Sequence, residues 1–506
     1  MKDKNYLLSV LGLSAIPRIV TSALTFICFP LMIRALGASN YGIVVYIGAI
    51  IGTLESFVDF GVSSAAGKAI AEARETNSKP LNQVIECWAK LQTKVALIGF
   101  IPLICATYLI SVNSKTEFSL QLMGLLVMAS WITISLNFVR ASMNSLLAFK
   151  SIAIVDTFES ILRSATWLCV AFFMPSPLGL AIAQIISALC TSVMGIYLLK
   201  RLISEKQISN KFENTLNDSN NTRLSGKQML MESSHFLWLR LITRIFQAIP
   251  IFLFGRIFGS ALVGIVGAFA KISELINFPF SIIGNALAVR AQGVVLNGVL
   301  ATRKLWDAVS RIFAMAVIFS IMVFLGADII AGILLPGNLT AGGIIAILSL
   351  TILSNSFSSI IAPMSDYIGA LKSRNILMTV FTVLQAAGIF IASKQFGSIG
   401  AVIAYVINLL LMNSGYIVIA LRAFFPKQRY QLRREMIYFI LIVVIALIGV
   451  IILRNTPVFK TLFLKGATFI SMLIFLAVLL ASLLANVQMR TFFITKSFLD
   501  FQHPVN

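Results

Sequence analysis

The feature that most constrains this chain is a series of apolar stretches, each long enough to cross a lipid bilayer. A bilayer core about 30 Å thick requires roughly 20 apolar residues per helix, and only helices or closed barrels satisfy the backbone there. Of the 506 residues, 58% are hydrophobic and 12% are charged, unlike a soluble globular domain. The sequence therefore predicts an all-α polytopic membrane protein.

The apolar stretches predict 14 membrane-spanning helices, and 12 is the alternative count. Six of them precede a long polar stretch in the middle of the chain, and eight follow it. The spans are expected near residues 7–33, 41–64, 88–111, 118–140, 152–174, 177–199, 233–256, 260–283, 307–335, 340–369, 376–393, 397–421, 437–453 and 462–486.

The net charge of +21 follows largely from the orientation in the membrane. Counting both termini and every second loop as cytoplasmic places 28 of the 40 Lys and Arg residues inside, seven outside and five within spans. Cytoplasmic loops carry such an excess of basic residues. We therefore expect a multi-pass protein of the bacterial inner membrane with both termini in the cytoplasm, and no nucleic-acid partner.

The sequence gives no indication of catalysis. Histidine is limited to His235 and His503, and no nucleotide loop, nucleophile motif or metal cluster is present. The outer loops are too short to carry the acids, bases or ligands of a sugar polymerase. The five cysteines lie within or near spans and form no disulfide or metal pattern. We expect no enzyme, no cofactor and no metal site.

The polar stretch from residue 200 to 230 is rich in Asn, Ser, Lys and Glu, which is typical of a flexible linker. It separates two halves of similar size. The predicted organisation is an N-terminal six-helix bundle (1–200), a cytoplasmic linker (201–232), a C-terminal six-helix bundle (233–425) and two additional helices with a cytoplasmic tail (426–506).

The two halves are related by an internal repeat. With an offset of 222 residues, nine of the 27 positions in residues 18–44 are identical to those in 240–266. The repeat aligns Gly37 with Gly259, and both are expected to take positive φ where one helix reverses into the next. The first helices of both halves run outward, so the repeat is parallel, with its axis along the membrane normal.

The opening of the chain resembles a known family. It has an arginine, Arg18, within the first span, then Pro30-Leu-Met-Ile-Arg-Ala-Leu-Gly37, Tyr41-Gly42 and Asp59-Phe-Gly61. This is similar to the Wzx-type O-antigen flippases, the polysaccharide-transporter branch of the multidrug/oligosaccharidyl-lipid/polysaccharide exporter superfamily. The resemblance covers residues 1 to about 421. Those proteins usually have 12 helices, whereas a count of 14 is closer to lipid II flippases.

The resemblance implies a function and partners. Two bundles would alternate between inward-open and outward-open states around a cavity that accepts a polyprenyl-pyrophosphate-linked oligosaccharide and carries it to the outer leaflet. The lipid-linked oligosaccharide and membrane lipids are the implied partners, with a polysaccharide polymerase and assembly proteins as further candidates.

Basic residues within spans are the candidate substrate-binding groups. An ionisable group in mid-bilayer costs about 2.5–3.5 kcal/mol or more, so each must pair or face a wet cavity. A guanidinium keeps its charge and binds phosphate oxygens through two donors. Snorkelling and in-helix ion pairs are the structural alternatives. The candidates are Arg18, Arg163, Arg240, Arg244 and Lys271.

Three carboxylates within spans are the candidate ion-coupling groups. Glu55 and Asp59 lie four residues apart on one helix face, where two close carboxylates make one of them easier to protonate. Alternatively, both neutralise basic residues such as Arg18 and Lys68. Glu274 lies three residues after Lys271 and can pair with it.

Two other transport functions share the expected fold. A lipid II flippase also handles a polyprenyl pyrophosphate, and complementation of a strain that lacks peptidoglycan flipping would separate the two. An ion-coupled multidrug exporter would favour an acidic or aromatic cavity for organic cations. The arginines at mid-depth favour an anionic substrate.

Overall fold

The structure is a computed structural model that describes residues 2–76, 81–113, 120–209, 226–296, 315–338, 340–367 and 371–424. The described residues form helices joined by turns, with no strand among them. This confirms the predicted all-α class. The two additional helices expected after residue 425, and the middle of the expected linker, lie outside the described residues, as does the side chain of Arg18.

The helices follow the predicted spans closely. Eight described helices are long and apolar enough to cross a membrane, and a ninth span results if Met315–Leu325 and α10, bent by 64°, are one broken span. The bounds are α1 Lys2–Asp59, α2 Val62–Thr76, α3 Leu81–Asn113, α4 Leu120–Ser145, α5 Phe149–Phe173, α6 Pro177–Ser209, α7 Gly226–Phe258, α8 Ser260–Leu296, α10 Ala327–Leu334, α11 Ala341–Tyr367 and α12 Leu371–Phe424.

Two of these helices each contain two predicted spans. In α1 the helical backbone breaks at Gly37, and in α12 it breaks at Gly397. Gly259 separates α7 from α8 in the same way. The φ angles of Gly37 and Gly259 are 78° and 86°, a region that glycine enters without steric cost. The positive φ predicted at these two repeat-related positions is thereby confirmed.

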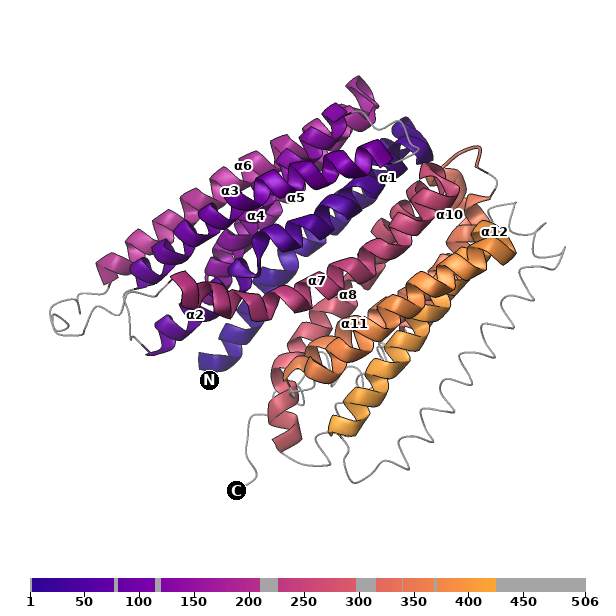
Figure 1. Ribbon diagram of the computed structural model, residues 1–506. Coiled ribbons are helices and arrows are strands. Elements are labelled where there is room, and N and C mark those ends of the chain that lie inside the picture. The colour runs from indigo at the N-terminus through magenta and orange to yellow at the C-terminus, as the bar shows by residue number, and fades with distance from the viewer. Residues whose placement is uncertain are drawn as a thin grey trace.

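The helices group into two halves, and α7 lies on the side of the second half that faces the first (Figure 1). In the first half, α1 packs on α5, α4 packs on α6, and α2 covers the ends of α3 and α4. In the second half, α11 packs on α8 and α12, and α12 packs on α7. Contacts of α1 with α7 and α8 join the halves, and one hydrophobic core includes residues of both.

The contact between the halves follows the internal repeat. A Cβ atom built on Gly42 would lie 1.8 Å from the carbonyl oxygen of Ser260, and one built on Gly264 would lie 1.8 Å from that of Ala38. Under the 222-residue offset, position 42 corresponds to 264 and position 38 to 260. The contact is therefore reciprocal, as at a two-fold axis.

A third glycine lies at the centre of this crossing. Gly267 faces Val45, and a Cβ atom on Gly267 would lie 2.9 Å from a Val45 methyl carbon. Positions 45 and 267 are equivalent in the repeat, so this pair lies close to the axis that relates the halves. Ser39 and Ser260 add a hydrogen bond of 2.7 Å between their hydroxyl oxygens. We call this contact between α1 and α8 the glycine crossing.

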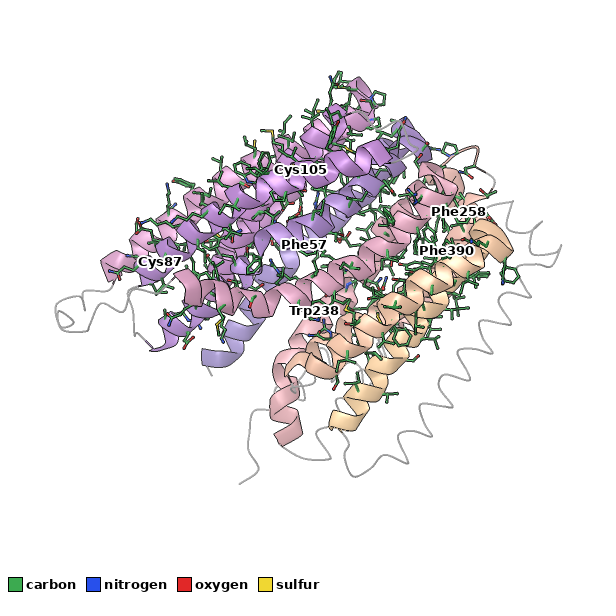
Figure 2. All side chains as sticks on the ribbon, in the orientation of Figure 1. Phe57, Cys87, Cys105, Trp238, Phe258 and Phe390 are labelled. Atoms are coloured by element: carbon green, nitrogen blue, oxygen red, sulfur yellow. The ribbon has the colours of Figure 1, made fainter. Side chains whose placement is uncertain are left out.

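Large apolar side chains are exposed on both halves. The side chains of Phe57, Trp238 and Phe390, labelled in Figure 2, are 48%, 55% and 46% exposed. Exposed apolar surface on this scale is unfavourable in water and favourable against lipid chains. Together with the apolar helices, it identifies a multi-pass membrane protein.

Candidate functional site

One cavity lies between the halves and is lined by α1, α5 and α8. Its volume is about 390 Å³. Its lining combines hydroxyl, amide and charged groups with apolar surface, and the polar members are Thr21, Ser22, Thr25, Arg163, Lys271, Glu274, Asn277 and Ser281. We call it the inter-half cavity.

A second cavity of about 460 Å³ extends into the first half among α1, α4, α5 and α6. We call it the bundle cavity. Arg163, Trp167 and Lys271 line both cavities, so the two adjoin at these side chains. Lys271 belongs to the second half, and it reaches the bundle cavity from α8. The further polar lining consists of Tyr41, Ser130, Thr133, Glu159, Gln184 and Ser187.

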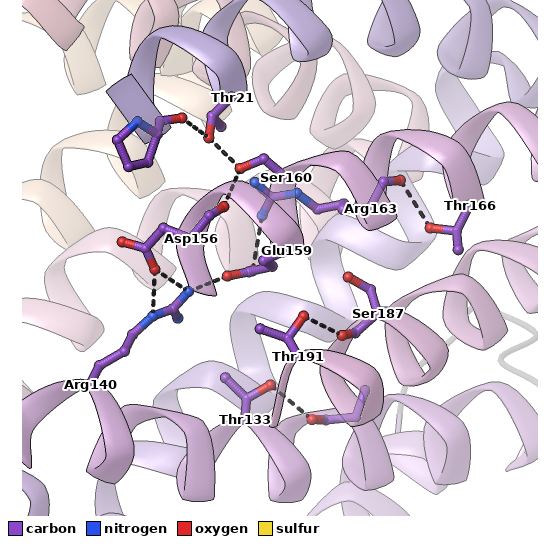
Figure 3. Close-up of polar contacts among 12 residues, drawn as sticks. Thr21, Thr133, Arg140, Asp156, Glu159, Ser160, Arg163, Thr166, Ser187 and Thr191 are labelled. Carbon is purple, nitrogen blue, oxygen red and sulfur yellow. Dashed lines mark hydrogen bonds and ion pairs between the residues drawn. The ribbon is translucent and has the colours of Figure 1, made fainter. Parts of the chain in front are cut away.

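A chain of ion pairs leads from α4 to this junction (Figure 3). The Nε of Arg140 donates to Asp156 Oδ1 at 3.0 Å, and its Nη2 lies 2.9 Å from the same oxygen. Arg140 Nη2 also donates to Glu159 Oε2. The other oxygen of Glu159 accepts from Arg163 Nη1 at 3.5 Å. Glu159 is therefore shared between two arginines, and its contact with Arg163 is the longer one.

The two cations at the junction keep capacity for another anion. Arg163 lies over the ring of Trp167, with its guanidinium carbon 5.7 Å from the ring centroid. Its side chain is 33% exposed, and that of Lys271 is 38% exposed. Lys271 Nζ donates to Glu274 at 2.9 Å, as the spacing predicts. One arginine on the first half and one lysine on the second thus face the same space.

The charges around the junction balance within the described residues. The cations are Arg140, Arg163 and Lys271, and the carboxylates are Asp156, Glu159 and Glu274. A balanced set lowers the cost of holding ionised groups within the membrane. An entering anion must therefore compete with a carboxylate for Arg163 or Lys271.

Asp59 and Arg240 form an ion pair away from the cavities. Asp59 is 4% exposed, and it also accepts hydrogen bonds from Ser63 Oγ at 2.6 Å and Gln92 Nε2 at 3.1 Å. The pair joins α1 of the first half to α7 of the second. It lies 17 residues beyond Gly42, about 25 Å along the helix, at the opposite end from the glycine crossing.

Glu55 and Arg244 lie near this ion pair. Glu55 accepts a hydrogen bond from Asn137 Nδ2 at 3.2 Å and feels the charges of Arg244, Asp59 and Arg240. Arg244 is exposed and makes no ion pair with another described residue. The predicted site residues therefore divide into two groups, one at the cavities (Arg163, Lys271, Glu274) and one between α1 and α7 (Glu55, Asp59, Arg240, Arg244). For Arg18 the structure gives only the position of its backbone in α1.

Arg140, Asp156 and the uncharged lining of the bundle cavity were not among the residues predicted from the sequence. Arg140 is the last residue of a predicted span, so its charge is explained by a position at the start of a loop. The signal was the short connection between two antiparallel helices, which places Arg140 opposite Asp156 and Glu159. Gln184 and Thr133 give no signal, because single uncharged polar residues are common in membrane helices. In the part of the chain that the structure describes, no group of three or more His, Cys, Asp or Glu residues could hold a metal ion.

Residues 11–288 match the family model described as polysaccharide biosynthesis protein, and they make up more than half of the 506 residues. The chain belongs to the polysaccharide biosynthesis protein family. The matched region runs from α1 into α8 and contains both the glycine crossing and the ion pairs at the cavities. No curated protein matches the sequence.

Several solved structures share the fold of this polysaccharide biosynthesis family protein. An inward-facing multidrug resistance MATE family transporter of the MOP superfamily has a TM-score of 0.64 at 15% identity, over 81% of this chain and 98% of that one. The lipid II flippase MurJ in an inward closed conformation has a TM-score of 0.56 at 12% identity, over 91% and 99% of the two chains. The polysaccharide-related family resemblance seen in the sequence is confirmed by the family match, and these likenesses show the shared fold.

Proposed function

We propose that this protein carries a polyprenyl-pyrophosphate-linked oligosaccharide from the cytoplasmic to the outer leaflet of the bacterial inner membrane by alternating access. Membership of the polysaccharide biosynthesis family and the shared transporter fold support this proposal. The observation that carries it is the junction of the two cavities, where Arg163 and Lys271 from opposite halves face one space.

The junction suits a pyrophosphate group. A guanidinium can donate two parallel hydrogen bonds to phosphate oxygens, and an ammonium adds a compact charge. Because Arg163 and Lys271 belong to different halves, an anion between them would connect the halves and respond to their relative movement. Glu274 and Glu159 would release these cations as the substrate arrives, so the site stays neutral when empty.

The bundle cavity suits the sugar part of the substrate. Its lining offers an amide at Gln184, hydroxyls at Ser130, Thr133 and Ser187, and the ring of Trp167. Sugar hydroxyls need such donors and acceptors, and a sugar ring presents C–H groups to an aromatic face. A volume of about 460 Å³ lies in the range of small-molecule sites. The polyprenyl chain would remain in the lipid outside the bundle.

Glu55 is the better candidate for a coupled proton in this mechanism. Three donors, including Arg240, already hold Asp59. Among the described residues Glu55 accepts one hydrogen bond, from a neutral amide, so its carboxylate is held by fewer partners than that of Asp59. Glu274 would serve the substrate anion rather than the ion, because it lies at the cavity beside Lys271.

The test is surface polysaccharide display in cells that lack their own flippase gene. Wild type, Arg163→Gln and Lys271→Gln are compared at matched membrane levels, with Lys394→Gln as control. Lys394 lies over the ring of Phe390 on α12 and lines neither cavity. Wild type and the control should restore display, and each cavity variant should reduce it on the order of tenfold or more while lipid-linked intermediates accumulate inside.

Three outcomes would overturn the proposal. Full display with both cavity variants would mean that the junction does not bind the substrate. No display with wild type, together with rescue of a strain lacking peptidoglycan flipping, would assign the chain to lipid II. Resistance to organic cations in place of rescue would assign it to drug export.

A further inference from the structure

Arg140 forms ion pairs with two carboxylates near the cavities, yet it lines neither cavity. Its guanidinium holds both Asp156 and Glu159 of the neighbouring helix α5. The connection between α4 and α5 is short, and α5 is also fixed to α1 through the hydrogen bond between Ser160 and Thr21 (Figure 3). Arg140 therefore acts on carboxylates whose backbone positions are already determined.

Glu159 lies between two arginines that differ in their surroundings. Its Oε2 is bonded to Arg140, and its Oε1 lies 3.5 Å from Arg163, at the outer limit of a hydrogen bond. The Arg163 side chain has five N–H donors in a rigid fork, and this long contact is the one hydrogen bond that the side chain makes to another described residue. The carboxylate is thus held towards Arg140 and away from the junction.

We propose that Arg140 is a positioning residue that keeps Glu159 from closing onto Arg163, and so leaves the Arg163 guanidinium available to the pyrophosphate group of the substrate. The inference rests on the proposed function and adds to it a residue outside the cavities. Without Arg140, Glu159 gains a full ion pair with Arg163, four residues away on the same helix. The substrate must then displace that carboxylate in order to bind.

Asp156 provides a matched control for this role. It carries the same charge as Glu159 and bonds to the same arginine, but it has no contact with Arg163. If Arg140 only neutralises carboxylates within the membrane, removing either carboxylate should compensate for its loss. If Arg140 positions Glu159, only the removal of Glu159 should do so.

The experiment measures the affinity of purified protein in lipid nanodiscs for inorganic pyrophosphate and for farnesyl diphosphate. The variants are Arg140→Gln alone, Arg140→Gln with Glu159→Gln, and Arg140→Gln with Asp156→Asn, compared at equal folded fraction. Affinity should fall on the order of tenfold in the first and third variants, as expected when a charged partner competes for the same donor. The second variant should bind within about twofold of wild type.

A single variant keeps the test decisive if Arg140→Gln does not fold. Glu159→Gln alone leaves Arg140 bonded to Asp156 and removes the carboxylate that could close onto Arg163, so it should bind pyrophosphate at least as tightly as wild type. Weaker binding by this variant would overturn the inference, as would unchanged affinity of Arg140→Gln or equal rescue by Asp156→Asn.

The inference and the proposed function fail in different ways. Wild-type protein that binds neither diphosphate would overturn the proposed function, and the role of Arg140 with it. Wild-type binding that is lost in Arg163→Gln but retained in Arg140→Gln would leave the proposed function in place and overturn the role of Arg140 alone.

Discussion

At the scale of single residues, charge and hydrogen-bonding capacity are arranged differently around the two cavities. The cations at the junction face carboxylates, whereas Gln184 in the bundle cavity makes no hydrogen bond to another described residue. A half-buried amide without a protein partner can donate to and accept from a hydroxyl of a ligand. The bundle cavity therefore offers a ligand an uncharged polar group, whereas the junction offers cations.

Gln184→Leu should reduce transport of the sugar-bearing substrate while diphosphate binding stays unchanged. Loss of one neutral hydrogen bond weakens sugar binding by about 0.5–1.5 kcal/mol, a few-fold to about tenfold effect. Transport is measured as surface display, and diphosphate affinity is measured in nanodiscs. The control Gln121→Leu changes an exposed amide on α4 that lines neither cavity, and it should behave as wild type. Equal loss of diphosphate binding in Gln184→Leu would contradict a contact limited to the sugar.

The charged residues of the junction could be predicted from the sequence, because Arg163, Lys271 and Glu274 stand out within apolar stretches. Gln184 and Ser187 could not be predicted, since their place in the lining depends on which face of α6 looks into the cavity. The pairing of Arg140 with two carboxylates depends on the register of α4 against α5, which the hydropathy pattern leaves open.

At the scale of helices, the glycine crossing sets how closely α1 approaches α8. Gly42→Ala would place a Cβ atom against the Ser260 carbonyl, which is backbone and cannot rotate away. Such overpacking costs about 1–3 kcal/mol, so the thermal unfolding midpoint in detergent should fall by several degrees. The matched control is Gly124→Ala, on α4, where nothing lies within 4 Å of the added Cβ. Equal stability of the two variants would contradict a close contact at this position.

The Asp59–Arg240 ion pair should stabilise the arrangement in which α1 and α7 are close. Asp59→Asn leaves Arg240 without its carboxylate, and loss of a charged hydrogen bond costs about 1–3 kcal/mol, with the lower part expected because Arg240 is partly exposed. Thermal unfolding of the two single variants and of Asp59→Asn with Arg240→Gln measures the coupling. Additive effects of the two substitutions would show that the pair contributes nothing.

The repeat allowed the sequence to predict more at this scale than hydropathy alone. The 222-residue offset matched Gly37 with Gly259, and both have positive φ. The same offset aligns Gly42 with Gly264, which pack reciprocally against the other half. An alignment shows that two positions are equivalent, but it does not show which residues they contact. The partner of Asp59 could not be predicted for the same reason, since Arg240 lies 181 residues away in the other half.

At the scale of the whole molecule, two contacts join the halves at opposite ends. The glycine crossing lies beside the reversals at Gly37 and Gly259, and the Asp59–Arg240 pair lies at the far end of the same arm of α1. The cavities lie between these two contacts. Alternating access requires the glycine crossing to open while the Asp59–Arg240 pair remains closed. In the opposite state, the pair opens and the glycine crossing remains closed.

A disulfide across the glycine crossing should therefore stop transport. The Ser39 and Ser260 hydroxyl oxygens lie 2.7 Å apart, so Ser39→Cys with Ser260→Cys can be oxidised in a background that lacks the five native cysteines. Oxidation should abolish surface display, and a reducing agent should restore it. Each single cysteine variant serves as control. Transport by the cross-linked protein at the rate of the reduced form would show that the halves need not separate at this end.

The most direct test of the central claim is flipping by purified protein in vesicles that contain a fluorescent polyprenyl-pyrophosphate oligosaccharide in both leaflets. A membrane-impermeant quencher reports how much of the lipid reaches the outer leaflet. Wild type and Lys394→Gln should expose the inner pool to the quencher, and Arg163→Gln should do so on the order of tenfold more slowly. An inner pool that remains protected with wild-type protein, as in protein-free vesicles, would contradict the account.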